Sequence, residues 1–210
     1  MRLVESGFII ETPLQNLGMN MLKRIERAGR TCYKSEENIT GISAVDFTRS
    51  IIKNGHHSVL EHESVSVRFI CDRGVTHEMV RHRIASYSQE STRFCNYSTD
   101  KFRGQIAFMQ PTFQLDDDDL ELLLVIEKHY MKCIENGRSP QDARYFLPNG
   151  LKTEIVMTCN LREWRHFFTL RAASKKAHPQ MRATAIPVLN AFKQFIPVVF
   201  DDIILDEDRS

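Results

Sequence analysis

The sequence lacks the features that identify several common protein classes. Its 210 residues contain no CxxC pair, and its nine glycines form neither a GxGxxG nor a GxxxxGK motif. No apolar run approaches the ~18 residues that a membrane-spanning helix needs. These absences argue against a membrane helix, a zinc ribbon, and a dinucleotide held on a Rossmann turn or P-loop. Side chains must therefore hold any phosphate-bearing ligand, and no association with membranes is expected.

The five cysteines are odd in number and widely spaced. This usage is typical of reduced thiols, and it favours neither a disulfide framework nor a metal site. The first residues lack the basic start and apolar centre of a signal peptide. We therefore expect a cytoplasmic protein.

The formal net charge is only +1, which is too small to attract a nucleic-acid polymer over long distances. Basic residues nevertheless gather at 73–103 and 162–182, balanced by acidic residues at 116–119 and 201–208. This distribution favours a small anionic ligand. The basic residues and aromatics of 81–103 also allow a second hypothesis, a single-strand nucleic-acid module with steeply salt-dependent binding.

Hydrophobic periodicity predicts one α+β domain over residues 1–210, with a small, mostly antiparallel sheet surrounded by helices. Alternating apolar residues predict strands at 64–71 and 151–159, and 105–109 is expected to be a short strand. Small polar residues make 86–97 an expected ordered loop. Helices are expected at 12–29, 43–55, 72–83, 116–137, 160–170 and 179–195, and another is expected to start at Ser139-Pro140.

Four residues are expected at particular places in these helices. Gly29 should end the first helix, because glycine commonly follows a helix C-terminus. Val80 should face the core. Asn160 and Glu163 have the spacing of a capping box at the start of the 160–170 helix.

Residues 81–93 combine three arginines and one histidine with hydroxyl and amide side chains. Guanidinium groups bind phosphate oxygens in pairs, and hydroxyls and amides can bind a polar ring or a sugar. The segment therefore indicates a binding site for an anionic ligand such as a nucleotide. The alternative is a solvated basic surface loop.

Two histidine-containing clusters raise the question of a metal. The segment from His56 to His62 could hold a metal or make ordinary hydrogen bonds. His77 and His82 are five residues apart, which separates them by roughly 140° around a helix instead of placing them on one face. We therefore predict no zinc helix there. Glu78 and Arg81 could form a helix ion pair or both turn towards a nucleotide.

A second polar set follows the strand at 151–159. Arg162, His166 and Arg171 are spaced so that they share a face of one helix, while the aromatic residues of that helix belong to the core. The pattern suits a binding face. Plain amphipathicity is the alternative.

Arg81-His82-Arg83, followed after seven residues by Ser91, resembles the signature of the flavin-dependent thymidylate synthases, the ThyX family. Arg144, Asn160-Leu161-Arg162 and Leu170-Arg171 follow in family order. The resemblance implies a homotetramer with active sites shared between subunits. It implies conversion of dUMP to dTMP, with methylenetetrahydrofolate as carbon donor and NADPH, through FAD, as hydride source.

The resemblance also implies roles for individual residues. Arg171 would be catalytic, by stabilising the N3-ionised uracil so that C5 becomes more nucleophilic. The substrate dUMP would contact Glu78, Met79, Val80, Arg81, Gln89, Glu90, Ser91, Thr92, Arg93, Arg144 and Arg171. FAD would contact Ser58, Glu61, Arg81, His82, Arg83, Gln89, Asn160, Leu161, Arg162, His166 and His178. No metal ligand is implied.

Some positions differ from residues common in the family. Glu90 stands where an apolar or amide residue is common, Thr92 where glutamine or glycine is common, and His166 where asparagine is frequent. An inactive member that only senses nucleotides is a third hypothesis. The presence of Arg171 argues against it.

Overall fold

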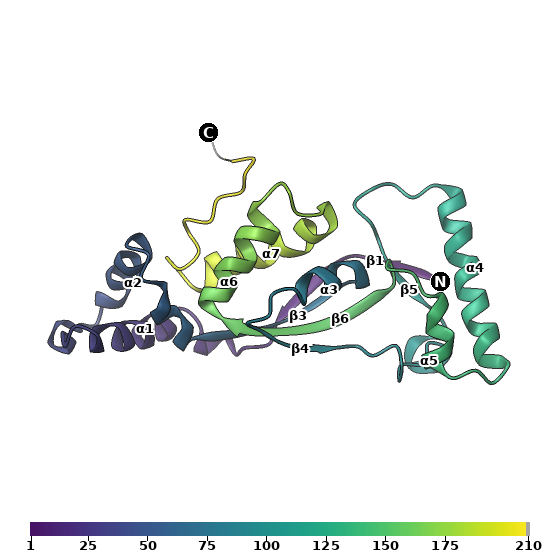
Figure 1. The fold of residues 1–210 in the computed structure, drawn as a ribbon, viewed down its shortest axis with the longest axis horizontal. Helices are drawn as coiled ribbons and strands as arrows, with labels where there is room; N and C mark the ends of the chain where they lie inside the picture. The colour runs from purple at the N-terminus through teal and green to yellow at the C-terminus, as the bar shows by residue number, and fades with distance from the viewer. Residues whose placement is uncertain (209–210) are drawn as a thin grey trace. The chain divides into compact units, whose positions relative to one another are not determined.

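In the computed structural model, which describes residues 1–208, four strands form the larger sheet (Figure 1). Their order is β2 (Gly7–Ile10), β3 (Ser64–Asp72), β6 (Lys152–Asn160) and β4 (Ser86–Gln89). The sheet is antiparallel, so the predicted α+β class is confirmed. Strands β3 and β6 match the predicted alternation, since every second residue from Val65 to Phe69 and from Thr153 to Cys159 is buried.

Strand β4 corrects the prediction of a loop over residues 86–97. Its four residues pair with β6 at the edge of the sheet. The small polar side chains of this segment have weak strand propensity, so the pairing with β6 decides the conformation. Residues after Gln89 are irregular, as predicted.

The chain divides into two compact units. Unit 1 comprises Met1–Gly7, Phe69–Arg81 and Ser88–Ile155. Unit 2 comprises Phe8–Arg68, His82–Tyr87 and the chain from Val156 onward. Among the described residues no helix has both the length and the apolar character to span a membrane.

Unit 1 has a two-stranded parallel sheet, in which Leu3 of β1 (Arg2–Val4) pairs with Phe108 of β5 (Ala107–Met109). Its core is formed by buried residues that include Tyr97, Phe108 and Tyr130. The helical segments are α3 (Arg73–Met79), η4 (Asp100–Phe102), α4 (Asp117–Glu135), α5 (Pro140–Ala143) and η5 (Arg144–Phe146).

Helix α3 is shorter than predicted. It begins after Asp72, whose carboxylate accepts a hydrogen bond from the Val75 N–H at 2.7 Å. It ends at Met79 instead of near residue 83, and Val80 is 43% exposed. The inward orientation predicted for Val80 is therefore wrong, because the chain leaves the helical path towards β4 within a few residues.

Unit 2 is built around a cluster of aromatic side chains carried by its helices. Trp164 stacks on Phe168, with ring centroids 5.4 Å apart, and both rings contact Phe192. The helical segments are η1 (Leu14–Asn16), α1 (Met19–Thr31), η2 (Glu36–Asn38), α2 (Ser43–Lys53), η3 (His57–His62), α6 (Leu161–Phe168), the π-helix η6 (Thr169–Ala173) and α7 (Pro179–Phe195).

The first helix differs from its prediction at both ends, and a glycine accounts for each difference. A 3₁₀ turn precedes it, and α1 itself starts after Gly18, whose φ of 64° L-residues rarely adopt. Gly29 lies inside α1 instead of ending it. A Cβ at Gly29 would be 2.4 Å from the Phe47 ring, so glycine lets α1 and α2 pack closely.

Candidate active site

Burial separates the three residues of the Arg-His-Arg motif. His82 is only 4% exposed, while Arg81 and Arg83 are exposed. The irregular backbone between α3 and β4 allows successive side chains to point in different directions. The histidine is therefore part of the interior, and both guanidinium groups are accessible to an anionic ligand.

In unit 2, His82 is held between an acid and a cation. Its Nδ1 lies 3.0 Å from Glu163 Oε1, and its Nε2 accepts a hydrogen bond from Arg171 Nε at 3.2 Å. An arginine N–H only donates, so Nε2 must be the unprotonated nitrogen. In the neutral ring the proton then resides on Nδ1, which donates to Glu163.

The charge state of His82 follows from its surroundings. Burial lowers the pKa of His82; the hydrogen bond to Glu163 raises it, and the nearby Arg171 and His166 lower it. Because the net direction is downward from the ordinary value of 6.5, the ring is neutral at pH 7. The network then carries one negative charge, on Glu163, and one positive charge, on Arg171.

Helix α6 positions this network from a rigid base. The Asn160 side chain accepts from the Glu163 N–H at 2.9 Å, which caps the helix as predicted. Trp164 Nε1 donates to the Val65 carbonyl at 3.0 Å, which ties α6 to β3. The carboxylate of Glu163, however, binds His82 instead of completing the expected capping box.

Arg171 lies on η6, the π-helical segment that follows α6. A π-turn widens the backbone and changes the direction of the side chains that follow it, and such turns are frequent at functional sites. Arg171 is half-buried, and the rings of His166 and Phe167 contact His82 edge-on at centroid distances of 5.3 and 5.1 Å. Of the predicted helix face, His166 and Arg171 therefore both lie against His82, while Arg162 pairs with Glu61.

His82, Glu163 and His166 also place metal-ligand types of atom within 4.8 Å of one another. One nitrogen of His82 donates to Glu163 and the other accepts from the cationic Arg171. A metal at His82 would have to displace one of these hydrogen bonds next to a positive charge. A hydrogen-bonded charge network accounts for the geometry.

The remaining residues of the predicted FAD set differ in exposure. Arg162 and Glu61 form an ion pair at 2.6 Å, with side chains 55% and 46% exposed. Leu161 is fully buried, and its N–H donates to the Glu63 carbonyl, so this residue belongs to the interior of unit 2. Ser58, His166 and His178 are exposed, and His178 Nδ1 accepts from the Gln180 N–H at the start of α7.

In unit 1, hydroxyl groups hold the Gln89 side chain. Its amide nitrogen donates to the hydroxyls of Thr76 at 3.0 Å and Thr153 at 3.4 Å. Both threonines are buried. The amide is thereby oriented before any ligand arrives.

Both carboxylate oxygens and the N–H of Glu90 bind protein groups of unit 1. Tyr97 donates to one carboxylate oxygen at 2.9 Å, and Lys152 donates to the other at 3.1 Å. The Glu90 N–H donates to the Glu154 carbonyl at 2.8 Å. Lys152 and Tyr97 are thus supporting residues that motif reasoning did not find.

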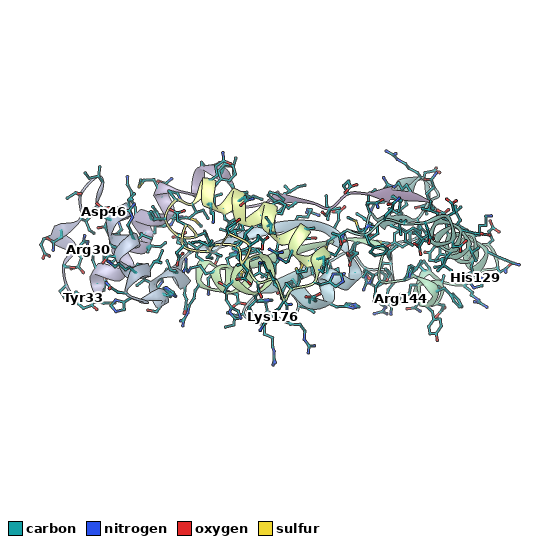
Figure 2. All side chains as sticks on the ribbon, turned by 90° about the horizontal axis from the view of Figure 1, so that it is seen from above. Arg30, Tyr33, Asp46, His129, Arg144 and Lys176 are labelled. Carbon is teal, nitrogen blue, oxygen red and sulfur yellow. The ribbon has the colours of Figure 1, made fainter. Side chains whose placement is uncertain are left out.

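The next residues of unit 1 meet the segment around Arg144. An Arg144 guanidinium nitrogen donates to the Thr92 hydroxyl at 3.3 Å, and Arg93 donates to the side chain of Gln141 at 3.5 Å. Both arginines are exposed, and Arg144 is labelled in Figure 2. The Ser91 hydroxyl accepts from the Arg93 N–H. Two segments about 50 residues apart in the sequence thus present cations and a hydroxyl together.

At the end of α3, the structure divides the predicted substrate contacts by burial. Met79 is fully buried, Glu78 is half-buried and Val80 is exposed. Met79 therefore packs in the interior of unit 1, and Glu78 and Val80 are the accessible residues of this group.

Glu163 is a further residue of the site whose role the motifs did not reveal. It precedes Phe167 by four residues, so both lie on one face of α6. A carboxylate on the aromatic, buried face of a helix requires a partner. The position of Glu163 on the aromatic face of α6 was therefore the feature of the sequence that could have indicated its role.

The family model described as thymidylate synthase complementing protein matches residues 17–198. The chain belongs to this family. Two relatives named flavin-dependent thymidylate synthase are 33% identical over 186 residues in Geobacter sulfurreducens and 35% identical over 201 residues in Mycobacterium tuberculosis. The alignments cover 83% and 85% of this chain, and 78% of each relative.

Two solved structures share the fold. The crystal structure of thymidylate synthase X from Helicobacter pylori with FAD and dUMP is 24% identical, with a TM-score of 0.73, and the match covers 95% of this chain and 99% of that one. The UMP/dUMP methylase PolB from Streptomyces cacaoi is 18% identical, with a TM-score of 0.76, over 96% and 95%. The ThyX-like fold expected from the motif is confirmed.

Proposed function

We propose that this protein is a flavin-dependent thymidylate synthase that methylates dUMP to dTMP. Methylenetetrahydrofolate donates the carbon, and NADPH supplies the hydride through FAD. The observation that carries the proposal is the family match over residues 17–198 together with Arg171 held in a buried charge network. Residues 1–210 act as one functional domain.

The donor groups on the chain suit FAD. Arg83 and Arg162 are exposed guanidinium groups of unit 2, the kind of group that binds a diphosphate. When bound, FAD supplies the redox chemistry, and the protein binds and orients it. We assign FAD binding to Ser58, Glu61, Arg81, His82, Arg83, Gln89, Asn160, Leu161, Arg162, His166 and His178.

The dUMP site is assigned to the polar groups that unit 1 brings together. Arg93 and Arg144 would bind the phosphate, with the Ser91 hydroxyl beside them. The oriented amide of Gln89 would read a polar ring edge. Glu78, Met79, Val80, Arg81, Glu90 and Thr92 complete the proposed contacts from unit 1.

Arg171 is the proposed catalytic residue. Its guanidinium would lie against the uracil, where a fixed cation stabilises the negative charge that develops when N3 ionises. The charge then makes C5 a better nucleophile, without a covalent bond to the enzyme. The same side chain would contact dUMP as part of the substrate site.

A homotetramer with shared active sites is part of the proposal. Ile84 and Phe94, next to the motif residues in sequence, are 69% and 78% exposed, and Tyr145, next to Arg144, is 85% exposed. Exposed apolar side chains mark a protein interface where they form a contiguous patch. Analytical ultracentrifugation gives the assembly mass directly, and a monomer at working concentration would contradict this part. The five free cysteines support a cytoplasmic location.

The decisive experiment combines a spectrum with an assay. The purified protein should show a flavin absorption band, and it should oxidise NADPH and form dTMP only when dUMP and methylenetetrahydrofolate are both present. A colourless protein that takes up neither FAD nor dUMP would defeat the proposal. Steeply salt-dependent binding of an oligonucleotide, with no binding of dUMP, would favour the nucleic-acid module instead.

A further inference from the structure

The orientation of Arg171 depends on a residue that makes no proposed contact with substrate or cofactor. We propose that Glu163 is a positioning residue: it holds His82 in the Nδ1–H form, so that the bare Nε2 accepts from Arg171 Nε and directs the guanidinium towards the uracil. This inference rests on the proposed catalytic role of Arg171. It adds a residue outside the Arg-His-Arg motif to the machinery of the reaction.

The geometry requires one tautomer. Arg171 Nε and His82 Nε2 are 3.2 Å apart, which is a hydrogen bond only if Nε2 carries no proton. In the other neutral tautomer two N–H groups would point at each other. Arg171 would then lose its hydrogen bond to His82, which sets the direction of its Nε–H.

Glu163 is the group that selects this tautomer. Its Oε1 lies 3.0 Å from His82 Nδ1, and the two side chains are 9% and 3% exposed. A carboxylate accepts hydrogen bonds and does not donate them, so it favours a proton on Nδ1. Such acid–histidine pairs fix the tautomer and orientation of the ring that they contact.

The other groups around His82 do not replace this acceptor. His166 contacts the ring edge-on, and the Tyr87 hydroxyl donates to the His82 carbonyl. Arg171 and His166 both disfavour a proton charge on the imidazole, and Glu163 is the acid that faces it. Without Glu163, the described network offers Nδ1–H no acidic partner.

The test compares Glu163→Leu with Glu163→Gln in the FAD-loaded enzyme. Leucine removes the acceptor, so kcat should fall about 100-fold, the cost of misplacing a catalytic group by about 1 Å. The KM for dUMP and the FAD content should change less than about threefold, because ground-state binding is retained. Glutamine still offers an amide oxygen to Nδ1–H, so it should restore kcat to within about tenfold of wild type.

A second readout reports the tautomer itself. Solid-state NMR of histidine-labelled holoenzyme, with His82 assigned by its absence in His82→Asn, should show a protonated Nδ1 and a bare Nε2. The Leu variant should move the proton to Nε2 in a substantial fraction of molecules. Should Glu163→Leu not fold, Glu163→Asp withdraws the carboxylate by one methylene and should give the same shift.

The matched control is Glu26→Gln. Glu26 is 1% exposed and pairs with Arg30 in α1, so this variant also removes a buried carboxylate from unit 2. It should lower the melting temperature while leaving kcat and the His82 tautomer unchanged. Wild-type kcat or an unchanged tautomer in Glu163→Leu would overturn the inference. A wild-type protein that forms no dTMP would overturn the proposed function, and the tautomer comparison would still decide what Glu163 does.

Discussion

The two units hold their candidate site residues in different ways. In unit 2, Arg171 is half-buried and bound to the neutral ring of His82, which lies between Glu163 and the aromatic layer of α6. In unit 1, Arg93 and Arg144 are exposed and contact neutral side chains at 3.3–3.5 Å. Unit 2 has a cation that is already fixed in position. Unit 1 has cations whose hydrogen bonding a bound ligand would complete.

This difference matches two chemical tasks. Stabilising charge that develops during a reaction is effective when the dipoles and charges are already fixed, because no reorganisation is needed at that moment. Binding a phosphate only requires donors that can close on it, and exposed arginines do this well. The comparison predicts that unit 2 variants mainly lower kcat, while unit 1 variants mainly raise KM.

Arg171→Ala should have the largest effect. Removing one fixed electrostatic donor lowers kcat by about 10²–10³-fold in comparable sites, and FAD should stay bound. Arg171→Lys should be nearly as slow, because lysine is a point charge without the planar fork. Single-turnover formation of dTMP with prebound dUMP measures the effect. Wild-type rates in either variant would contradict the proposed catalytic role of Arg171.

Arg93→Ala and Arg144→Ala test the role of unit 1 in the comparison. A hydrogen bond to a charged group contributes about 1.5–3 kcal/mol, so the KM for dUMP should rise about 10- to 150-fold. The change in kcat should be small. Steady-state assays give both parameters. Arg49→Ala is the surface control, because Arg49 forms an exposed ion pair with Asp46; Figure 2 labels Asp46. A selective loss of kcat would contradict the division of tasks.

Lys152→Met should lower the stability of the fold and, as a consequence, the affinity for dUMP. Lys152 and Glu90 are 18% and 14% exposed, so the variant leaves a carboxylate without its cation in a half-buried place. The free energy of unfolding should fall by about 1–3 kcal/mol, and dUMP affinity should fall as the residue 89–91 segment loosens. Urea denaturation measures the first and calorimetric titration the second. Unchanged stability would mean that Lys152 does not hold Glu90 in solution.

The smallest expected effect is a pH dependence from unit 2. The pKa of His82 is lowered in the folded protein from its ordinary value of 6.5, chiefly by burial. As the pH falls through 6.5, the unfolded chain gains a proton that the folded chain does not, so the free energy of unfolding decreases. Above 6.5 this contribution is complete.

Denaturation of wild type and His82→Asn between pH 5 and 8 isolates this contribution. The variant should be less stable overall and should show a shallower slope below about pH 6.5. Parallel curves would show that His82 titrates normally in the folded state.

Strong local patterns were predicted correctly, and contacts between distant segments were not. The alternation of 64–71 and 151–159 produced β3 and β6, and Asn160 caps α6 as expected. Strand β4 was missed because pairing with β6 makes this segment a strand, and its own polar residues show no strand pattern. Gly29 was predicted to end the first helix, but glycine is needed there because the ring of Phe47, in another helix, packs against it.

By itself, the sequence determined the chemical inventory of this protein: the Arg-His-Arg motif with Ser91, the later Arg144 and Arg171, and the family to which they belong. Tertiary structure alone decided how those groups are used. Glu163 has the spacing of a helix cap, yet its carboxylate binds His82, 81 residues away. The physical reason is that a buried carboxylate takes the nearest donor in space, and folding, not chain spacing, places that donor.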